Sequence, residues 1–155
     1  MMEIVRTLTR DAGMLNMKPA TKLEWLGQLV EGLCDAWRLP RRDDILRAVL
    51  ERESAQSTAI GQGVAVPHGK TSAVPRLMMA CGIAPDGVPD YDAPDDPPAR
   101  VGFLLVSPKS EAGPPVRALR AITRLAIPAG APDPPLQTTP PWELPKTPRR
   151  ADQDA

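Results

Sequence analysis

The chain has 155 residues, with 19 basic and 19 acidic side chains and no net formal charge. This length suits one domain with a modest core, and the absence of a basic block argues against a nucleic-acid partner held by its phosphates. No stretch approaches the ~20 apolar residues of a membrane span, and no signal-peptide core is visible, so we expect a cytoplasmic protein. Cys34 and Cys81 lie far apart without metal-ligand spacing, which predicts free thiols and no metal site.

The first predicted helix follows a weakly patterned segment, residues 1–20, which we expect to be weakly ordered or to contain a strand. Thr21 and Glu24 form a capping box, with a hydroxyl at the helix start and a carboxylate three residues later. Apolar residues then recur at helical spacing, namely Leu26, Leu29, Val30, Leu33 and Trp37. Because Pro40 would stop the helix, the sequence predicts that it ends near Arg38.

A second helix is predicted from Asp43 to about Glu51. Its buried face would comprise Ile45, Leu46, Val49 and Leu50. The acidic residues at its start suit the positive end of the helix dipole. Arg52 would lie at the helix exit, where a long side chain can reach the following loop.

Strands are predicted next. Residues 61–68 are typical of a turn followed by a short strand, and residues 77–84 form an apolar run compatible with a strand. Residues 86–98 are turn-rich and acidic, as in a solvated loop. Residues 101–106 are continuously apolar, as in a strand covered on both faces. This alternation predicts an α/β fold with helices packed on a mixed sheet.

The end of the chain has a different composition. Val116, Leu119, Ile122 and Leu125 mark a third helical face. Eight prolines follow in residues 126–155. Because proline lacks a backbone donor and blocks regular structure, we expect a domain over 21–125 and a disordered tail over 126–155.

The strongest motif surrounds His68, which is the only histidine and therefore the only place for imidazole chemistry. Its positions are Arg52, Glu53, Ser57, Thr58, Ile60, Gly61, Gly63, Val64, Val66, Pro67, His68 and Gly69. Their identities and spacing resemble the phosphorylation site of enzyme IIA of the bacterial sugar phosphotransferase system. The resemblance is to the fructose, mannitol and nitrogen-regulatory branch.

The residue types near His68 suit phosphoryl transfer. Neutral imidazole is a good nucleophile near neutral pH, since its ordinary pKa is about 6.5. Pro67 would direct the chain at His68, and Gly69 would leave room for an incoming phosphoryl group. Arg52 can bind phosphate oxygens through parallel N–H groups, and Lys70 would add local positive charge.

The resemblance assigns roles to these positions. It implies that His68 is the phosphorylated histidine and that Arg52 is the site arginine. Supporting or phosphate-binding groups would come from the loop hydroxyls of Ser57 and Thr58 and from the glycine positions Gly61, Gly63 and Gly69.

The sequence departs from the family after the last predicted strand. The family places a second histidine at the start of the next helix, where this chain has Pro115. The family's further helical structure is replaced by the proline-rich tail. We therefore expect truncated C-terminal elements, from truncation or a frame shift. We also expect a carrier that is slow or that is phosphorylated without efficient onward transfer, because a lost transition-state donor costs roughly 10²–10³ in rate.

The resemblance implies a phosphocarrier without metal or organic cofactor. Its phosphoryl donor would be the histidine-containing carrier protein, and its acceptor a transporter's cytoplasmic component or a regulatory target. Two alternatives stay open: a non-catalytic regulatory or interaction module, and a degenerate product that folds poorly because its closing elements are absent.

Overall fold

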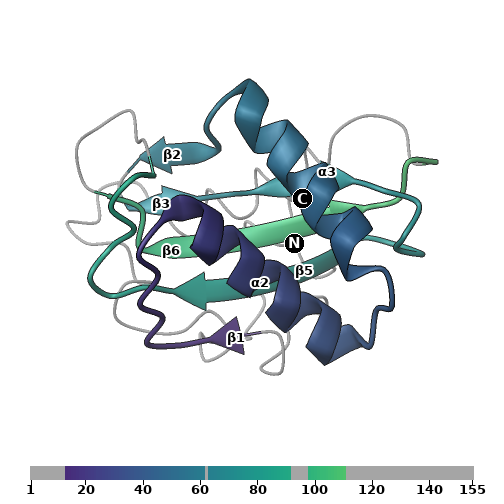
Figure 1. Ribbon diagram of the computed structural model, residues 1–155, viewed down its shortest axis with the longest axis horizontal. Helices are drawn as coiled ribbons and strands as arrows, with labels where there is room; N and C mark the ends of the chain where they lie inside the picture. Colours follow the sequence, from purple (N-terminus) through teal and green to yellow (C-terminus); the bar gives the residue numbers. More distant parts are fainter. Residues whose placement is uncertain (1–12, 62, 92–97, 111–155) are drawn as a thin grey trace, which may run out of the picture.

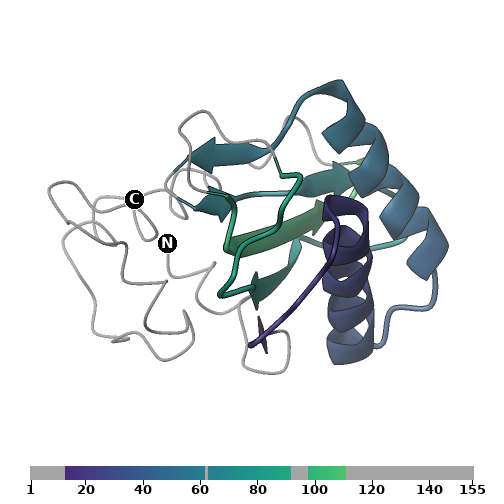
Figure 2. The ribbon, with the colours of Figure 1, turned by 60° about the vertical axis from the view of Figure 1, so that its left-hand side comes forward.

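The computed structural model describes residues 13–61, 63–91 and 98–110. Two helices, α2 and α3, lie side by side on one face of a mixed sheet, and the two views agree on this arrangement (Figures 1 and 2). The predicted fold class, helices packed on a mixed β-sheet, is confirmed.

The helices begin and end for local reasons. Helix α2 spans Lys22–Trp37, and the Thr21 hydroxyl accepts the Glu24 amide N–H at 3.1 Å, as the capping box predicts. It ends at Arg38, which adopts a left-handed conformation with φ 55°. Helix α3 spans Arg42–Ala55. It is longer than predicted, so Arg52 lies in its last turn.

The described sheet contains six strands in the order β1-β5-β6-β3-β2, with β4 also paired to β6. Their bounds are β1 Gly13–Met14, β2 Ala59–Gly61, β3 Val64–Ala65, β4 His68–Lys70, β5 Met78–Ile83 and β6 Val101–Ser107. Strand β6 is antiparallel to β5 and parallel to β3 and β4. The strands predicted at 77–84 and 101–106 are confirmed, and every residue of β6 is buried.

The strand predicted before His68 is interrupted. Strands β3 and β4 pair with β6 at the same offset, Ala65 with Gly102 and His68 with Leu105. They are therefore two parts of one extended segment, residues 64–70, which is interrupted at Val66 and Pro67. Proline cannot donate to the ladder, but its carbonyl still accepts the Leu105 N–H at 3.0 Å. The extended segment therefore keeps its register with β6 as far as His68.

Helix α2 approaches the sheet closely because glycines face it. A Cβ atom at Gly102 would lie 2.8 Å from Trp25, and one at Gly82 would lie 2.6 Å from Leu29. Trp25 and Leu29 are fully buried in this contact. Bulky helix residues and side-chain-free strand positions together form the centre of the core.

Other sequence predictions have different outcomes. Cys34 and Cys81 are buried free thiols, and burial raises the pKa of both. Among the residues described, no helix is long and apolar enough to cross a membrane. The third helix near 116–125, the proline-rich tail at 126–155 and most of the 1–20 leader lie outside the described residues; in the rest of the leader, Gly13–Met14 form β1.

Candidate functional site

The site begins with the contact between α3 and β4. Gly69 faces the helix backbone, and a Cβ atom there would lie 3.0 Å from both the Ala48 carbonyl carbon and the Val49 nitrogen. No other residue type allows this approach without a shift of the helix. Gly69 therefore seats β4 against α3, which is a packing reason for glycine that the sequence alone did not indicate.

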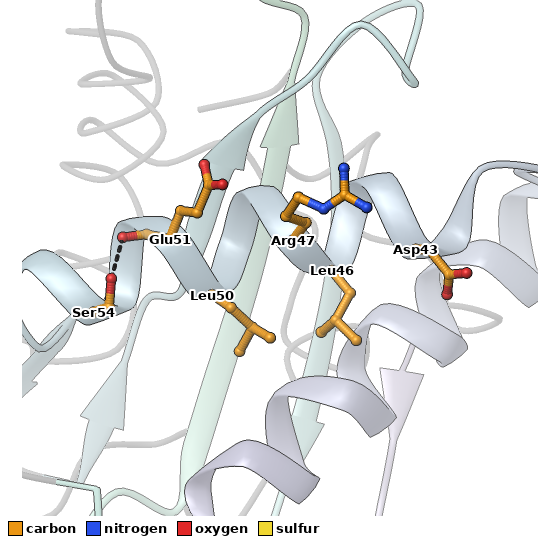
Figure 3. A pocket seen from close by; sticks show the side chains of 6 residues that line it. All are labelled: Asp43, Leu46, Arg47, Leu50, Glu51 and Ser54. Atoms are coloured by element: carbon orange, nitrogen blue, oxygen red, sulfur yellow. Dashed lines mark hydrogen bonds between the residues drawn. The ribbon is translucent and has the colours of Figure 1, made fainter.

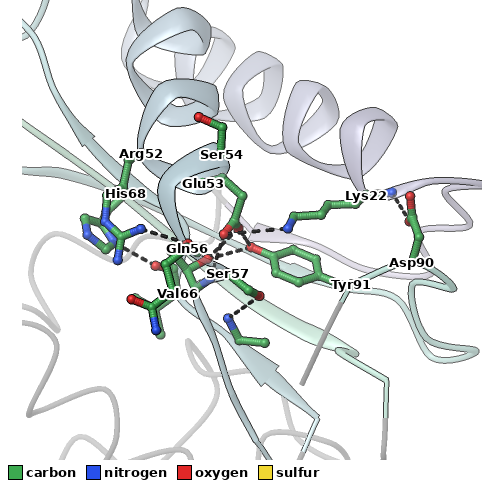
Figure 4. A network of polar contacts seen from close by, with 12 residues as sticks. Lys22, Arg52, Glu53, Ser54, Gln56, Ser57, Val66, His68, Asp90 and Tyr91 are labelled. Carbon is green, nitrogen blue, oxygen red and sulfur yellow. Dashed lines mark hydrogen bonds and ion pairs between the residues drawn. The ribbon is translucent and has the colours of Figure 1, made fainter. Parts of the chain in front are cut away.

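A backbone hydrogen bond also joins the loop after α3 to the extended segment that contains β3 and β4. The Val66 N–H donates to the Thr58 carbonyl at 3.0 Å. Gly69 thus lies at the level of Ala48, and Val66 lies at the level of the loop after the helix. Arg52 on the helix and His68 on the strand both lie between the Gly69–Ala48 contact and the Val66–Thr58 hydrogen bond. The fold therefore brings together the two residues that the motif assigned to catalysis (Figure 4).

The His68 ring has a defined tautomer. Its Nδ1 atom lies 2.9 Å from the Val66 carbonyl oxygen. A carbonyl oxygen can only accept, so Nδ1 carries the proton and the neutral ring keeps its lone pair on Nε2. The side chain is partly exposed. The arrangement orients the ring and leaves Nε2 as the nitrogen with the free lone pair.

Arg52 is anchored at the end of its own helix. Its Nη1 group donates to the Gln56 carbonyl at 2.8 Å, a favourable place for a cation because helix carbonyls there are negative. The side chain is partly exposed. A guanidinium carries several N–H groups, so this anchor is compatible with a forked contact to phosphate oxygens.

Beneath the loop lies a buried network of polar side chains centred on Glu53. One carboxylate oxygen accepts the Thr58 amide N–H at 2.6 Å, and the other accepts the Thr58 hydroxyl at 2.6 Å. The Tyr91 hydroxyl also donates to Glu53 and lies 2.6 Å from the Thr58 hydroxyl (Figure 4). All three residues are buried. Every one of these polar groups is therefore paired, as burial requires.

Lys22 and Trp25 complete the surroundings of Tyr91. The Lys22 ammonium lies 3.7 Å from the Glu53 carboxylate and 4.6 Å from the centre of the Tyr91 ring. Trp25 meets the ring edge to face, with centroids 5.7 Å apart. Burial raises the pKa of Tyr91, and its hydrogen bond to Glu53 raises it further. The phenol therefore stays protonated and acts as a donor.

The remaining motif positions support the loop. Gly61 and Gly63 adopt φ values of 94° and 80° at the turn between β2 and β3, a region that favours glycine. Ser57 accepts the Ala59 N–H at 3.3 Å, which tightens the entry to β2. The Thr58 hydroxyl donates to the Glu53 carboxylate, so this buried side chain holds the loop in place. Lys70 belongs to β4 and is partly buried.

Two members of the site were missed by reasoning from sequence. The motif contains Glu53 but assigns it no role, and Tyr91 lies outside the motif. Tyr91 is the only tyrosine in the chain and lies within the acidic, turn-rich segment 86–98, which was the available signal. Pro115, the replacement for the family's second histidine, lies outside the described residues.

A shallow surface groove lies elsewhere on α3 (Figure 3). Its lining residues form one stripe of the helix: Asp43, Leu46, Arg47, Leu50, Glu51 and Ser54. The leucines point toward α2, whereas Arg47 and Glu51 point away from it (Figure 3). Neither Arg52 nor His68 lines this groove, so it is distinct from the site.

Comparison with protein families identifies the motif's origin. Residues 7–128 match the family described as "Phosphoenolpyruvate-dependent sugar phosphotransferase system, EIIA 2". The "PTS system fructose-specific EIIA component" of Haloferax volcanii is 36% identical over 110 residues, which cover 71% of each chain. The "PTS system fructose-specific EIIABC component" of Bacillus subtilis is 34% identical over 126 residues. That match covers 81% of this chain but 20% of the Bacillus protein.

A solved structure shares the fold. The nitrogen regulatory protein IIA-Ntr from Neisseria meningitidis superposes with a TM-score of 0.66 at 26% identity, and the match covers 79% of this chain and 81% of that one. The relatives thus include both sugar-specific and nitrogen-regulatory proteins.

Proposed function

The chain belongs to the EIIA 2 family of the phosphoenolpyruvate-dependent sugar phosphotransferase system, and from this premise we propose that it carries a phosphoryl group on Nε2 of His68. Membership of this family supports a phosphocarrier or regulatory role, since its proteins are phosphotransferase components. The assignment to one atom of one residue is our own step.

One observation carries this proposal: the hydrogen bond from His68 Nδ1 to the Val66 carbonyl. A nucleophilic imidazole must be neutral, oriented and open at one nitrogen. The bond meets the second requirement and determines which nitrogen keeps its lone pair. The partial exposure of the side chain supports the third requirement.

The proposed transfer is balanced in atoms and charge. The Nε2 lone pair of His68 attacks the phosphorus of a phosphohistidine on the donor protein, and a new N–P bond forms. The donor's N–P bond breaks, and its electron pair returns to the donor imidazole. The proton stays on Nδ1 throughout, hydrogen-bonded to the Val66 carbonyl oxygen, whose negative end stabilises the positive charge that develops on the ring.

Arg52 would neutralise charge on the transferred group. In phosphoryl transfer, charge spreads over the three equatorial oxygens and catalysis is mainly positioning and electrostatics. Arg52 lies at the level of His68, and its guanidinium is hydrogen-bonded to the Gln56 carbonyl. The remaining N–H groups of the guanidinium can therefore bind the oxygens of the incoming phosphoryl group. Ser57, Thr58 and the glycines at 61, 63 and 69 hold the surrounding backbone.

The partners follow from this chemistry. We propose the histidine-containing carrier protein as the phosphoryl donor and a transporter's cytoplasmic component or a regulatory target as the acceptor, all in the cytoplasm. The transfer requires no metal or organic cofactor. The relatives are named as both sugar-specific and nitrogen-regulatory proteins, and the proposed first transfer does not depend on which kind of acceptor follows.

The test is transfer of radioactive phosphate from the phosphorylated carrier protein to this chain. We expect label that is labile in acid and stable in base, as a phosphoramidate is, and no label on His68→Ala. A folded chain that takes no label at any concentration of the phosphorylated carrier would refute the proposal. That result would favour a module that binds partners without phosphotransfer.

A further inference from the structure

We propose that Tyr91 is a positioning residue for phosphotransfer: acting with Glu53 through Thr58, it holds His68 and Arg52 in their reactive orientation. This inference rests on the proposed function. It concerns residues whose side chains are buried beneath the loop that follows α3. The carrying observation is a continuous series of hydrogen bonds from the Tyr91 hydroxyl to the His68 ring.

The first part of the series holds Thr58. Glu53 receives both the amide N–H and the hydroxyl of Thr58, each at 2.6 Å. Tyr91 donates to the same carboxylate and touches the Thr58 hydroxyl. Buried carboxylates need several donors and a nearby cation, and Lys22 supplies the cation at 3.7 Å. Tyr91 is thus one of the groups that keep Glu53 in place.

From Thr58 the series reaches the nucleophile. The Thr58 carbonyl accepts the Val66 N–H at 3.0 Å, and the Val66 carbonyl accepts Nδ1–H of His68 at 2.9 Å. The same peptide segment that Glu53 fixes therefore determines where the ring's anchor lies. A displacement of Thr58 would shift Val66 and rotate the imidazole.

From Thr58 a short link also reaches the guanidinium. Gln56 precedes Thr58 by two residues, and its carbonyl accepts the Arg52 side chain at 2.8 Å. Glu53 directly follows Arg52 on α3, so the carboxylate and the guanidinium leave neighbouring positions of one helical turn (Figure 4). The loop 56–58 is therefore held at both ends by residues of the site.

The Tyr91 hydroxyl can be separated from its ring. The ring packs edge to face on Trp25 and lies beneath Lys22, and both contacts survive in Tyr91→Phe. That substitution removes the hydroxyl alone. A purely structural role for Tyr91 predicts lower stability with unchanged chemistry in the folded molecules, whereas the positioning role predicts slower chemistry in molecules that are fully folded.

The experiment measures single-turnover phosphorylation of His68 as a function of phosphorylated carrier concentration. We compare the wild type with Tyr91→Phe and Thr58→Val. The matched control is Ser54→Ala, which removes an exposed hydroxyl from the same helix end, where it bonds the Glu51 carbonyl at 2.8 Å. All measurements are made well below the unfolding temperature of the least stable variant.

We expect the saturating rate of both site variants to fall about tenfold, since small misplacements of reacting groups are costly. The carrier concentration for half-maximal rate should stay within about twofold, because both substituted side chains are buried. Ser54→Ala should match the wild type. A wild-type saturating rate in Tyr91→Phe, or a change in the half-maximal concentration alone, would overturn the inference.

A second readout does not depend on transfer. Nitrogen-15 NMR follows the His68 ring nitrogens and the Arg52 Nε–H group in each variant. Tyr91→Phe should shift both sets of signals and increase the motion of Arg52, whereas Ser54→Ala should not. Unchanged His68 and Arg52 signals would overturn the positioning role. If the wild type takes no label, the proposed function fails, and this spectrum still decides whether Tyr91 orients the two side chains.

Discussion

Gly69 of β4 lies against Ala48 of α3 so closely that a Cβ atom at Gly69 would come within 3.0 Å of the Ala48 carbonyl carbon. This contact determines how near the helix carrying Arg52 can approach the strand carrying His68. The glycine next to the histidine thus acts through the packing of the two elements. It faces the helix, and the distance between the proposed catalytic residues Arg52 and His68 depends on that spacing.

Gly69→Ala should therefore impair both stability and transfer. The obstructing atoms belong to helix backbone, so α3 must move, and overpacking of this kind costs about 1–3 kcal/mol. The same movement separates Arg52 from His68 and should slow labelling of the folded protein.

The control is Gly27→Ala in α2, where a Cβ atom meets nothing within 4 Å. That change should stabilise the protein by about 0.5–1 kcal/mol. Denaturant unfolding measures the free energy of unfolding of both variants. Equal free energies for Gly69→Ala and Gly27→Ala would contradict the packing account.

Tyr91 should resist deprotonation in the folded protein. Burial is the main cause that raises its pKa above the ordinary 10.0, and Glu53 adds to it. Because the unfolded chain loses this proton near pH 10 and the folded chain keeps it, the free energy of unfolding should fall as pH rises above about 10. The chain has one tyrosine, so near-ultraviolet phenolate absorbance reports this residue alone. The absorbance should appear together with loss of helical circular dichroism. A phenolate signal that grows near pH 10 while the helices persist would show that Tyr91 is accessible.

Arg52→Ala should slow phosphorylation of His68 by about 10²–10³-fold, the usual cost of a lost transition-state donor. Arg52→Lys keeps the charge but loses the planar fork, so its rate should lie between those of the wild type and Arg52→Ala. Arg47→Ala is the matched control, because Arg47 is an exposed arginine of the same helix paired with Asp44 at 3.7 Å. It should label at the wild-type rate. Equal rates for Arg52→Ala and Arg47→Ala would remove Arg52 from the site.

Local signals in the sequence predicted much of the fold. The Thr21 capping box predicted the start of α2, and the continuous apolar run of residues 101–106 predicted the buried strand β6. These predictions succeeded because their causes lie within a few neighbouring residues. Strand β2 was missed because its three residues are too few to show alternation, and it exists through pairing with β3.

The site was predictable only in part, for the same reason. The spacing around His68 predicted which residues would carry phosphoryl chemistry, and the fold brings Arg52 and His68 to the same part of the molecule. The hydrogen bond between Tyr91 and Glu53 joins positions 38 residues apart, and no local pattern connects them. The tautomer of His68 likewise depends on the Val66 carbonyl oxygen, which lies 2.9 Å from Nδ1 of the ring. Such contacts arise from tertiary structure.

The account depends most directly on Nε2 of His68 receiving the phosphoryl group. Because the chain has a single histidine, long-range nitrogen-15 NMR of the imidazole can be read without assignment, before and after incubation with the phosphorylated carrier protein. We predict a proton on Nδ1 in both states and a phosphorus coupling on Nε2 after incubation. A phosphorus coupling on Nδ1, or an imidazole spectrum that stays unchanged while the carrier remains phosphorylated, would contradict the account.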